Sequence, residues 1–312
     1  STSNHWERAE AGNVAGLSFS KLFSMHAQVL QFLVSGLTLG AIYALIAFSF
    51  SLVFRTTRIM NIAQGEFSML GGMIAIALIG LALPMFLSVM AGIFLVAILG
   101  LIIERLIIRR VRTFPRMMVI MVTIGLSMTI QGFAVVFWGQ DSYLLPHLSG
   151  ADPIQILGAA ILPQTIWILA ISGVLSVLFW FFLGRTMIGL AMRASAENRL
   201  AASLVGINPI RVVQLSFVFG ASIGALAGVL VAPIVFMNFL SGVLLTIKGI
   251  VAAIVGGIES NVGAVVGGLA VGLAESMAAG IFPSMYKDVI ALLILLVVLC
   301  AMPKGIIRGS AR

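Results

Sequence analysis

Apolar runs long enough to cross a lipid bilayer recur along the whole of this 312-residue chain. A helix needs about 20 predominantly apolar residues to cross the hydrocarbon core of a membrane. Backbone polar groups find no partner in lipid, so each run has to satisfy its own hydrogen bonds as a helix. We therefore predict an all-α, polytopic bundle of about eight to ten spans. The candidate spans are residues 29–54, 60–80, 82–104, 116–139, 161–183, 212–233, 244–258, 261–281 and 286–302.

The residue composition excludes an ordinary water-soluble domain. Hydrophobic residues make up 61% of the chain and charged residues only 9%, against about 25% in soluble proteins. In a soluble protein the net charge of +8 would suggest a nucleic acid partner, but in a membrane protein it reflects which loops carry the cations. We expect no nucleic acid partner.

Lysine and arginine are concentrated in every second connection between the spans. Fourteen of the 18 cations lie at 55–58, 105–116, 184–211 and in the tail from Lys304 onward. The positive-inside rule makes these connections cytoplasmic, and with them the C-terminus. Nine crossings would place the N-terminus outside the cytoplasm. If one of the nine is a re-entrant segment, the N-terminus would instead be cytoplasmic, while the sides assigned to the loops would not change.

The chain divides into one large domain with two short ends. Residues 1–28 form a polar segment without the pattern of a cleavable signal peptide, so we expect targeting through the first span. Residues 29–308 form a single transmembrane domain, and 309–312 a C-terminal tail. The run at 244–258 is short for a crossing, which indicates a broken or re-entrant helix.

Glycines spaced four residues apart predict close packing between the helices. Small residues at this spacing let helix backbones approach each other where lipid gives no hydrophobic drive for association. The sets are Gly36 and Gly40; Gly220, Gly224 and Gly228; Gly263 and Gly267; and Gly268 and Gly272.

Ionisable residues inside the predicted spans are few, which disfavours an ion-coupled transporter. Glu66 and Glu259 lie in polar interruptions between apolar runs. Glu104 adjoins Arg105 at a cytoplasmic end, where we expect an interfacial position. The remaining candidates are Lys248 and Glu275, and the three histidines lie outside the spans.

The sequence carries no zinc-protease or nucleotide-binding motif. It has no phosphate-binding G-x-x-x-x-G-K-[ST] loop and no HExxH, and its single cysteine, Cys300, lies in an apolar run. We therefore expect no catalytic residue, no metal, no cofactor and no enzymatic activity of its own.

The long connection at 184–211 contains a short predicted helix from Ser195 to Val205. Ser195 or Asn198 could cap its start, and Gly206 with Pro209 ends it. One face carries leucines and another small residues, a pattern that suits docking into another protein's cleft. Packing on the chain's own bundle is the alternative. The leucines are Leu200 and Leu204, and the small residues Ala201, Ala202 and Ser203.

The stretch LAASLVG within this helix resembles the E-A-A-x-x-x-G coupling motif of permease subunits of bacterial ABC importers. Ala201, Ala202 and Gly206 match the motif. Leu200 stands where the motif has glutamate, and Glu197, one turn earlier, is a candidate to replace that carboxylate. The resemblance implies that these five residues couple the chain to an ATPase subunit.

The similarity extends over residues 29–308 to the LivH-type permeases of branched-chain amino acid importers. The matching stretches, in order, are GLTLGAIYALIAFSFSLVF, IMNIAQGEFSMLGG, GLAMRASAENRLAASLVGIN, GIVAAIVGGIESNVGAVVGGLAVGLAE and PKGIIRG. The family often has small residues with Pro or Gly where Glu259, Ser260 and Asn261 stand. This departure leaves the substrate open among branched-chain and other amino acids, amides, urea and aromatic acids.

The resemblance implies the helical fold of a type II importer in a bacterial inner membrane. It also implies four kinds of partner: the lipid bilayer, a second similar permease chain, two ATP-hydrolysing subunits and an extracytoplasmic substrate-binding protein. The expected function is a permease subunit for ATP-driven import of branched-chain or related amino acids. Energy supplied by a partner would account for the missing nucleotide loop and the scarcity of intramembrane acids.

Two polar interruptions are the candidate translocation path. Glycine permits irregular backbone, and broken helices commonly line a path through a bundle. Both interruptions also lie near predicted cytoplasmic ends, where Glu66 could simply be a first-turn acid favoured by the helix dipole. The first comprises Asn61, Gln64, Gly65 and Glu66, and the second Gly256, Gly257, Glu259, Ser260 and Asn261.

Two rival function classes remain open at the level of sequence. An ion-coupled secondary amino acid transporter would work without ATP and stop when the ion gradient collapses. A channel would carry flux in both directions without ATP. A purely structural membrane subunit is a more distant alternative.

Overall fold

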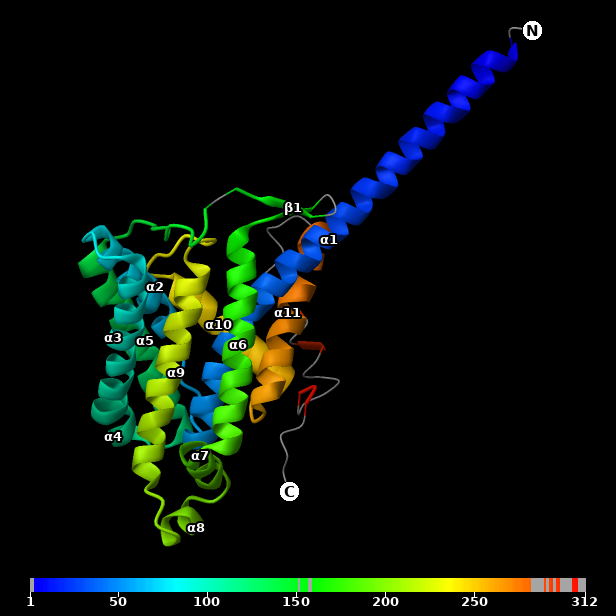
Figure 1. Cartoon of the computed structure of the whole chain (residues 1–312). Helices are drawn as coiled ribbons and strands as arrows, with labels where there is room; N and C mark the ends of the chain where they lie inside the picture. The colour runs from blue at the N-terminus through cyan, green and yellow to red at the C-terminus, as the bar shows by residue number, and fades with distance from the viewer. Residues whose placement is uncertain are drawn as a thin grey trace.

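The computed structural model of the chain describes residues 3–150, 152–156, 159–281, 289, 292, 293, 296, 297 and 305–307. Within these ranges the chain is a bundle of helices with one small hairpin (Figure 1). The helices are α1 (Ser3–Thr57), α2 (Gln64–Gly80), α3 (Met85–Ile103), the π-helical segment η1 (Glu104–Ile108), α4 (Arg109–Val111), α5 (Arg116–Trp138), α6 (Pro163–Arg185), α7 (Met187–Glu197), α8 (Arg199–Leu204), α9 (Pro209–Val231), α10 (Ser241–Gly256) and α11 (Asn261–Ile281). The hairpin pairs β1 (Ile154–Ile156) with β2 (Ala159–Ile161) in antiparallel register.

Six helices in the described part of the chain are long and apolar enough to cross a membrane. Two shorter apolar helices, α2 and α10, bring the total to eight, one for each of the first eight predicted spans. The predicted polytopic helical bundle is therefore confirmed. Most of the ninth run, 286–302, lies outside the described residues. The six long spans are Gln28–Thr57, Met85–Val111, Arg116–Trp138, Pro163–Arg185, Pro209–Val231 and Asn261–Gly280.

Local sequence signals account for several helix starts. Proline occupies the first turn of α6 and α9, where its missing N–H costs nothing. The side chain of Asn208 accepts hydrogen bonds from two backbone amides at the start of α9. The long helix α1 already begins at Ser3 and projects away from the bundle before it enters (Figure 1).

Glycine contacts hold the centre of the bundle together, as the four-residue spacings predict. A Cβ on Gly272 of α11 would lie 2.2 Å from the backbone nitrogen of Gly40 on α1. On α9, a Cβ on Gly228 would lie 1.7 Å from the carbonyl oxygen of Ser68 on α2. Because no side chain fits at these distances, only glycine allows these backbones to touch.

The two ends of the bundle differ in charge and structure. Figure 1 shows the β1–β2 hairpin at one end and α4, α7 and α8 at the other. At the α8 end, Arg199 donates to the carbonyl oxygen of Thr56, and Arg58 donates to that of Ala196. The chain returns to this same end at residues 305–307, where Ile306 and Ile307 donate to the last carbonyl oxygens of α10 at 2.9 and 3.1 Å. We call this the basic end.

Candidate functional site

The first polar interruption folds back into the bundle instead of remaining at its end. Arg58 follows the end of α1 with a φ of +60°, a left-handed conformation that turns the chain. Gln64, the first residue of α2, then donates through Nε2 to Ser49 Oγ at 3.1 Å. Ser49 precedes the end of α1 by eight residues, or about 12 Å at 1.5 Å per residue. The helix α2 therefore begins inside the bundle.

A compact polar cluster holds this buried helix start. Asn61 donates through Nδ2 to Gln64 Oε1 at 3.2 Å, and its own Oδ1 accepts from the backbone of Ala63. The amide of Gly65 donates to Thr246 Oγ1 of α10 at 3.1 Å. A Cβ on Gly65 would lie 2.2 Å from that same oxygen, so α2 and α10 approach closely here.

Glu66 is completely buried in the first turn of α2. Its Oε1 accepts hydrogen bonds from Ser127 Oγ at 2.7 Å and from Gln131 Nε2 at 2.8 Å, both on α5. Its Oε2 has no hydrogen-bond partner and lies where a side chain on Gly242 of α10 would stand. Glu66 is thus a first-turn acid, as one interpretation expects, and also an interior group that joins α2, α5 and α10.

The second interruption lies at the basic end. Gly257 ends α10 with a φ of +105°, and the backbones of Gly256 and Gly263 are in contact. Ser260 Oγ accepts from the amide of Gly263 at 3.0 Å, and Asn261 Oδ1 lies 3.0 Å from Ser51 Oγ on α1. The adjoining Glu259 forms an ion pair with Arg58, in which each side chain remains about half exposed.

The structure therefore brings both predicted groups of residues against the same helix, α1, but at different depths. Ser49 contacts the first group and Ser51 the second. The sequence analysis missed the partners on the other helices. A signal was present for two of them, since Ser127 and Gln131 stand four residues apart within an otherwise apolar run. Nothing in the local sequence singles out Thr246.

The predicted coupling helix is two helices, not one. Asn198 breaks the chain between α7 and α8 and caps α8, where its Oδ1 accepts from the amides of Leu200 and Ala201 at 3.0 Å each. Ser195 is not a cap, because it is buried within α7. Glu197 is the last residue of α7 and is exposed.

The surface of α8 is divided between an inward and an outward face. Ala202 is only 3% exposed and faces the bundle, whereas Ala201 is exposed. Leu200, Leu204 and Val205 are 78%, 87% and 76% exposed and form an apolar tip. Gly206 ends the helix with a φ of +88°. Figure 1 shows α8 as the outermost element of the basic end.

Arg199 fastens this outer helix to the bundle. Its guanidinium donates to the carbonyl oxygen of Thr56, the next-to-last residue of α1. Burial, and then the positive charges of Arg112 and Arg58, lower the pKa of Arg199 from its ordinary value. Three guanidiniums, those of Arg199, Arg112 and Arg58, therefore interact at this end of the bundle, in addition to the larger effect of burial on Arg199.

Comparison with known proteins identifies the family. The family model described as "Branched-chain amino acid transport system / permease component" matches residues 32–299. The permease protein LivH of Salmonella typhimurium is 34% identical over 298 residues, which is 89% of this chain and 95% of that protein, and LivH of Escherichia coli K12 gives the same values. This chain belongs to that family of permease components.

Two further comparisons extend this result. BraD of Pseudomonas aeruginosa, named a high-affinity branched-chain amino acid transport system permease protein, is 35% identical over 216 residues, 64% of this permease and 70% of BraD. The solved structure titled "PsaBC from Streptococcus pneumoniae in complex with Fab" aligns with a TM-score of 0.52 over 91% of this permease and 96% of that chain. At 16% identity, that alignment indicates a shared fold alone.

The other intramembrane ionisable residues of this permease are paired. Lys248 on α10 and Glu275 on α11 form a buried ion pair at 2.9 Å. Glu104 is buried among the helices and lies 3.5 Å from Arg109. The helix continues through η1 past Glu104, which keeps this carboxylate inside the bundle. Among the described residues, no group of three or more His, Cys, Asp or Glu side chains could hold a metal ion.

Proposed function

We propose that this permease is one of two transmembrane subunits of an ATP-driven importer in a bacterial inner membrane, and that it carries branched-chain or related amino acids inward. Its family and the names of its relatives, LivH and BraD, support this substrate class. The single observation that carries the energy-coupling part of the proposal is the exposed apolar tip of α8.

The tip of α8 is the proposed contact with an ATPase subunit. The tip exposes three large apolar side chains together at an otherwise polar, basic end. Exposure of such a patch to water is unfavourable in free energy, so the patch indicates a contact with another protein. Ala201 lies on the same exposed helix, and Glu197 and Gly206 flank it. Ala202 has a different role in this proposal, because it packs inward and transmits movement of the tip to the bundle.

The two polar interruptions are the proposed translocation path. Asn61, Gln64, Gly65 and Glu66 supply polar groups within the bundle, where a hydrated substrate needs them. The second group, Gly256, Gly257, Glu259, Ser260 and Asn261, forms the mouth at the basic end. We place this end, with the C-terminus, in the cytoplasm, because the arginine-rich connections and residues 305–307 meet there.

The remaining partners follow from this assembly. A second homologous permease chain would complete the path, two ATP-binding subunits would dock at the basic ends, and an extracytoplasmic substrate-binding protein would deliver substrate at the hairpin end. ATP binding would bring the two ATPase subunits together and move α8 with them, switching the bundle between inward and outward access.

Reconstitution of the complete transporter in liposomes tests this function. The double variant Leu200→Asp, Leu204→Asp places charges on the apolar tip, and we expect it to lose at least tenfold in both ATPase binding and ATP-dependent uptake. Leu81→Asp is the matched control, because Leu81 is 74% exposed at the end of α2 away from α8. Unchanged uptake in the double variant would refute the coupling surface, and uptake that persists without ATP would refute the ATP-driven importer.

A further inference from the structure

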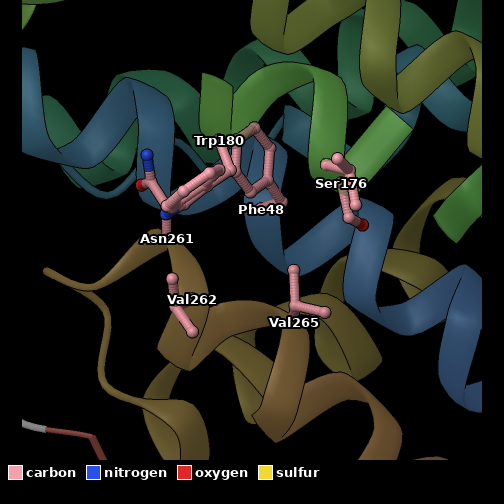
Figure 2. Close-up of a pocket in the computed structure, with 7 residues that line it drawn as sticks. Phe48, Ser176, Trp180, Asn261, Val262 and Val265 are labelled. Atoms are coloured by element: carbon pink, nitrogen blue, oxygen red, sulfur yellow. The ribbon is translucent and has the colours of Figure 1, made fainter. Parts of the chain in front are cut away.

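An open groove of about 290 Å³ lies on the outer side of the bundle, between α1, α6 and α11. In Figure 2, Val262 and Val265 of α11 face Phe48 of α1 and Trp180 of α6 across it. Trp180 and the neighbouring Val177 are 64% and 66% exposed, so the groove opens along the surface of α6. The walls are almost entirely apolar.

A basic pocket of only about 10 Å³ adjoins this groove toward the basic end. Its lining includes Leu52, Arg55 and Arg193, and Asn261 lines both cavities. Along α1, the apolar part at Phe48 and the basic part at Arg55 are seven residues apart, or about 10 Å. The two cavities together form one amphipathic groove, apolar toward the middle of the bundle and cationic at its end.

The charges around the basic pocket leave a net positive charge. Arg55 interacts electrostatically with Arg193, Arg58, Glu259 and Glu197. Glu259 is already paired with Arg58. In the described part of the chain, no ion pair involves Arg55 or Arg193. Three guanidiniums against two carboxylates amount to one excess positive charge.

Arg193 keeps donors available for a ligand. It uses one Nη2–H to hold the carbonyl oxygen of Gly184 at 3.0 Å, at the end of α6. A guanidinium has five N–H groups in a planar fork, which matches the oxygens of a phosphate. The bond to Gly184 also orients Arg193 along the end of α6, beside the groove.

We propose that this groove is a binding site for one anionic phospholipid. The phosphate lies at the mouth of the small pocket, against Arg55 and Arg193. The glycerol esters lie at Asn261 and Trp180, and one acyl chain occupies the apolar part against Phe48, Val262 and Val265. Tryptophan is the side chain that membranes favour at this depth, and basic pockets between helices are suited to anionic headgroups. The excess of guanidiniums over carboxylates suits an anionic phosphodiester.

The site connects moving parts of the proposed transporter and shares Asn261 with the mouth of the proposed path. Its residues come from α1, α6, α7 and α11, and α7 leads directly into α8. A bound lipid would therefore fasten the base of the α8 tip to the membrane-facing side of the bundle. This inference holds whether or not the chain imports amino acids.

Lipid binding to the full-length chain tests the site directly. The chain is purified into nanodiscs of phosphatidylcholine with increasing phosphatidylglycerol, and bound phosphatidylglycerol is counted by native mass spectrometry after release. We expect one retained molecule in the wild type. Each arginine near the membrane surface contributes about fivefold to anionic lipid binding, so Arg55→Gln, Arg193→Gln should weaken retention roughly twenty-five-fold. Arg110→Gln is the control, because it removes an exposed charge from the same end.

A second pair of variants tests the apolar part. Val262→Trp fills the groove, and we expect it to lower retention at least fivefold, whereas Val266→Trp, on the exposed surface of α11 outside the groove, should have no effect. Equal retention in wild type and the double arginine variant would overturn the proposal. It would also be overturned if millimolar inorganic phosphate displaced the lipid while Val262→Trp had no effect, which would mean a phosphate site alone. Occupation by residues 282–304 or by a partner chain would abolish phosphatidylglycerol retention in the wild type, and that result would overturn it too.

Discussion

The two polar interruptions look alike in sequence but have opposite environments in the fold. Each combines glycine with one glutamate and an amide side chain. Glu66 is completely buried, accepts two hydrogen bonds from α5 and leaves Oε2 without a partner. Glu259 is half exposed and paired with Arg58. The same residue types therefore serve an interior polar cluster in one case and an exposed ion pair in the other.

This difference follows from the path of the backbone, not from the side chains themselves. After α1 the chain reverses at Arg58 and returns about 12 Å into the bundle before α2 begins. After α10 it turns at Gly257 and starts α11 within four residues, still at the basic end. A polar contact contributes more to stability when it is buried. Substitutions at the inner interruption should therefore lower the free energy of unfolding more than the same substitutions at the outer one.

The largest expected effect is at Gly65. In Gly65→Ala the new Cβ would stand 2.2 Å from Thr246 Oγ1 and 2.4 Å from the carbonyl oxygen of Gly242, and backbone on both helices would have to move. We expect a loss of about 3 kcal/mol in unfolding free energy and no detectable uptake. Gly80→Ala is the control in the same helix, because nothing lies within 4 Å of its Cβ position. Thermal unfolding in detergent measures both, and equal midpoints would contradict the close approach of α2 to α10.

A smaller loss is expected when the buried carboxylate is removed. Glu66→Leu leaves the side chains of Ser127 and Gln131 without their acceptor in the interior. Hydrogen bonds within membrane bundles contribute about 0.6 to 1.7 kcal/mol each, so we expect a loss of about 2 kcal/mol. Ser127→Ala should therefore lower the free energy of unfolding much less in the Glu66→Leu background than in the wild type. Strict additivity in this double-mutant cycle would show that the two residues do not interact.

The smallest effect is expected at the outer ion pair. Both partners are about half exposed, so solvent screens their attraction and the pair contributes less than about 1 kcal/mol. Glu259→Gln should leave thermal stability nearly unchanged and retain most of the uptake activity. If Glu259→Gln lowered the free energy of unfolding as much as Glu66→Leu does, the two interruptions would contribute equally to stability, contrary to this expectation.

Much of the architecture could be predicted from local sequence because it has local causes. Apolar length determines the spans, glycine spacing determines the contacts of α11 with α1 and of α9 with α2, and the Asn198 side chain stops one helix and caps the next. The sequence also named Ser195 and Asn198 as alternative caps of the proposed coupling helix. Asn198 is the cap, and Ser195 is buried within the preceding helix α7.

The candidate site was less predictable because its contacts join residues far apart in the chain. Ser127 and Gln131 follow Glu66 by 61 and 65 residues, and Thr246 follows Gly65 by 181. Burial of Glu104 and Ser195 likewise depends on which helices cover them. The residue pattern within one segment does not show which distant segment packs against it. The sequence could therefore identify candidate residues but not how deeply they are buried.

The interior start of α2 also bears on the order in which the protein can be made. The amide of Gly65 depends on Thr246, which the ribosome adds 181 residues later. At about 5 to 20 residues per second, this partner arrives roughly 10 to 40 seconds after the helix start that needs it. During that interval the first turn of α2 has to be held by water, the insertion machinery or a temporary neighbour. The bundle therefore closes around its polar centre only late in synthesis, when α10 enters the membrane.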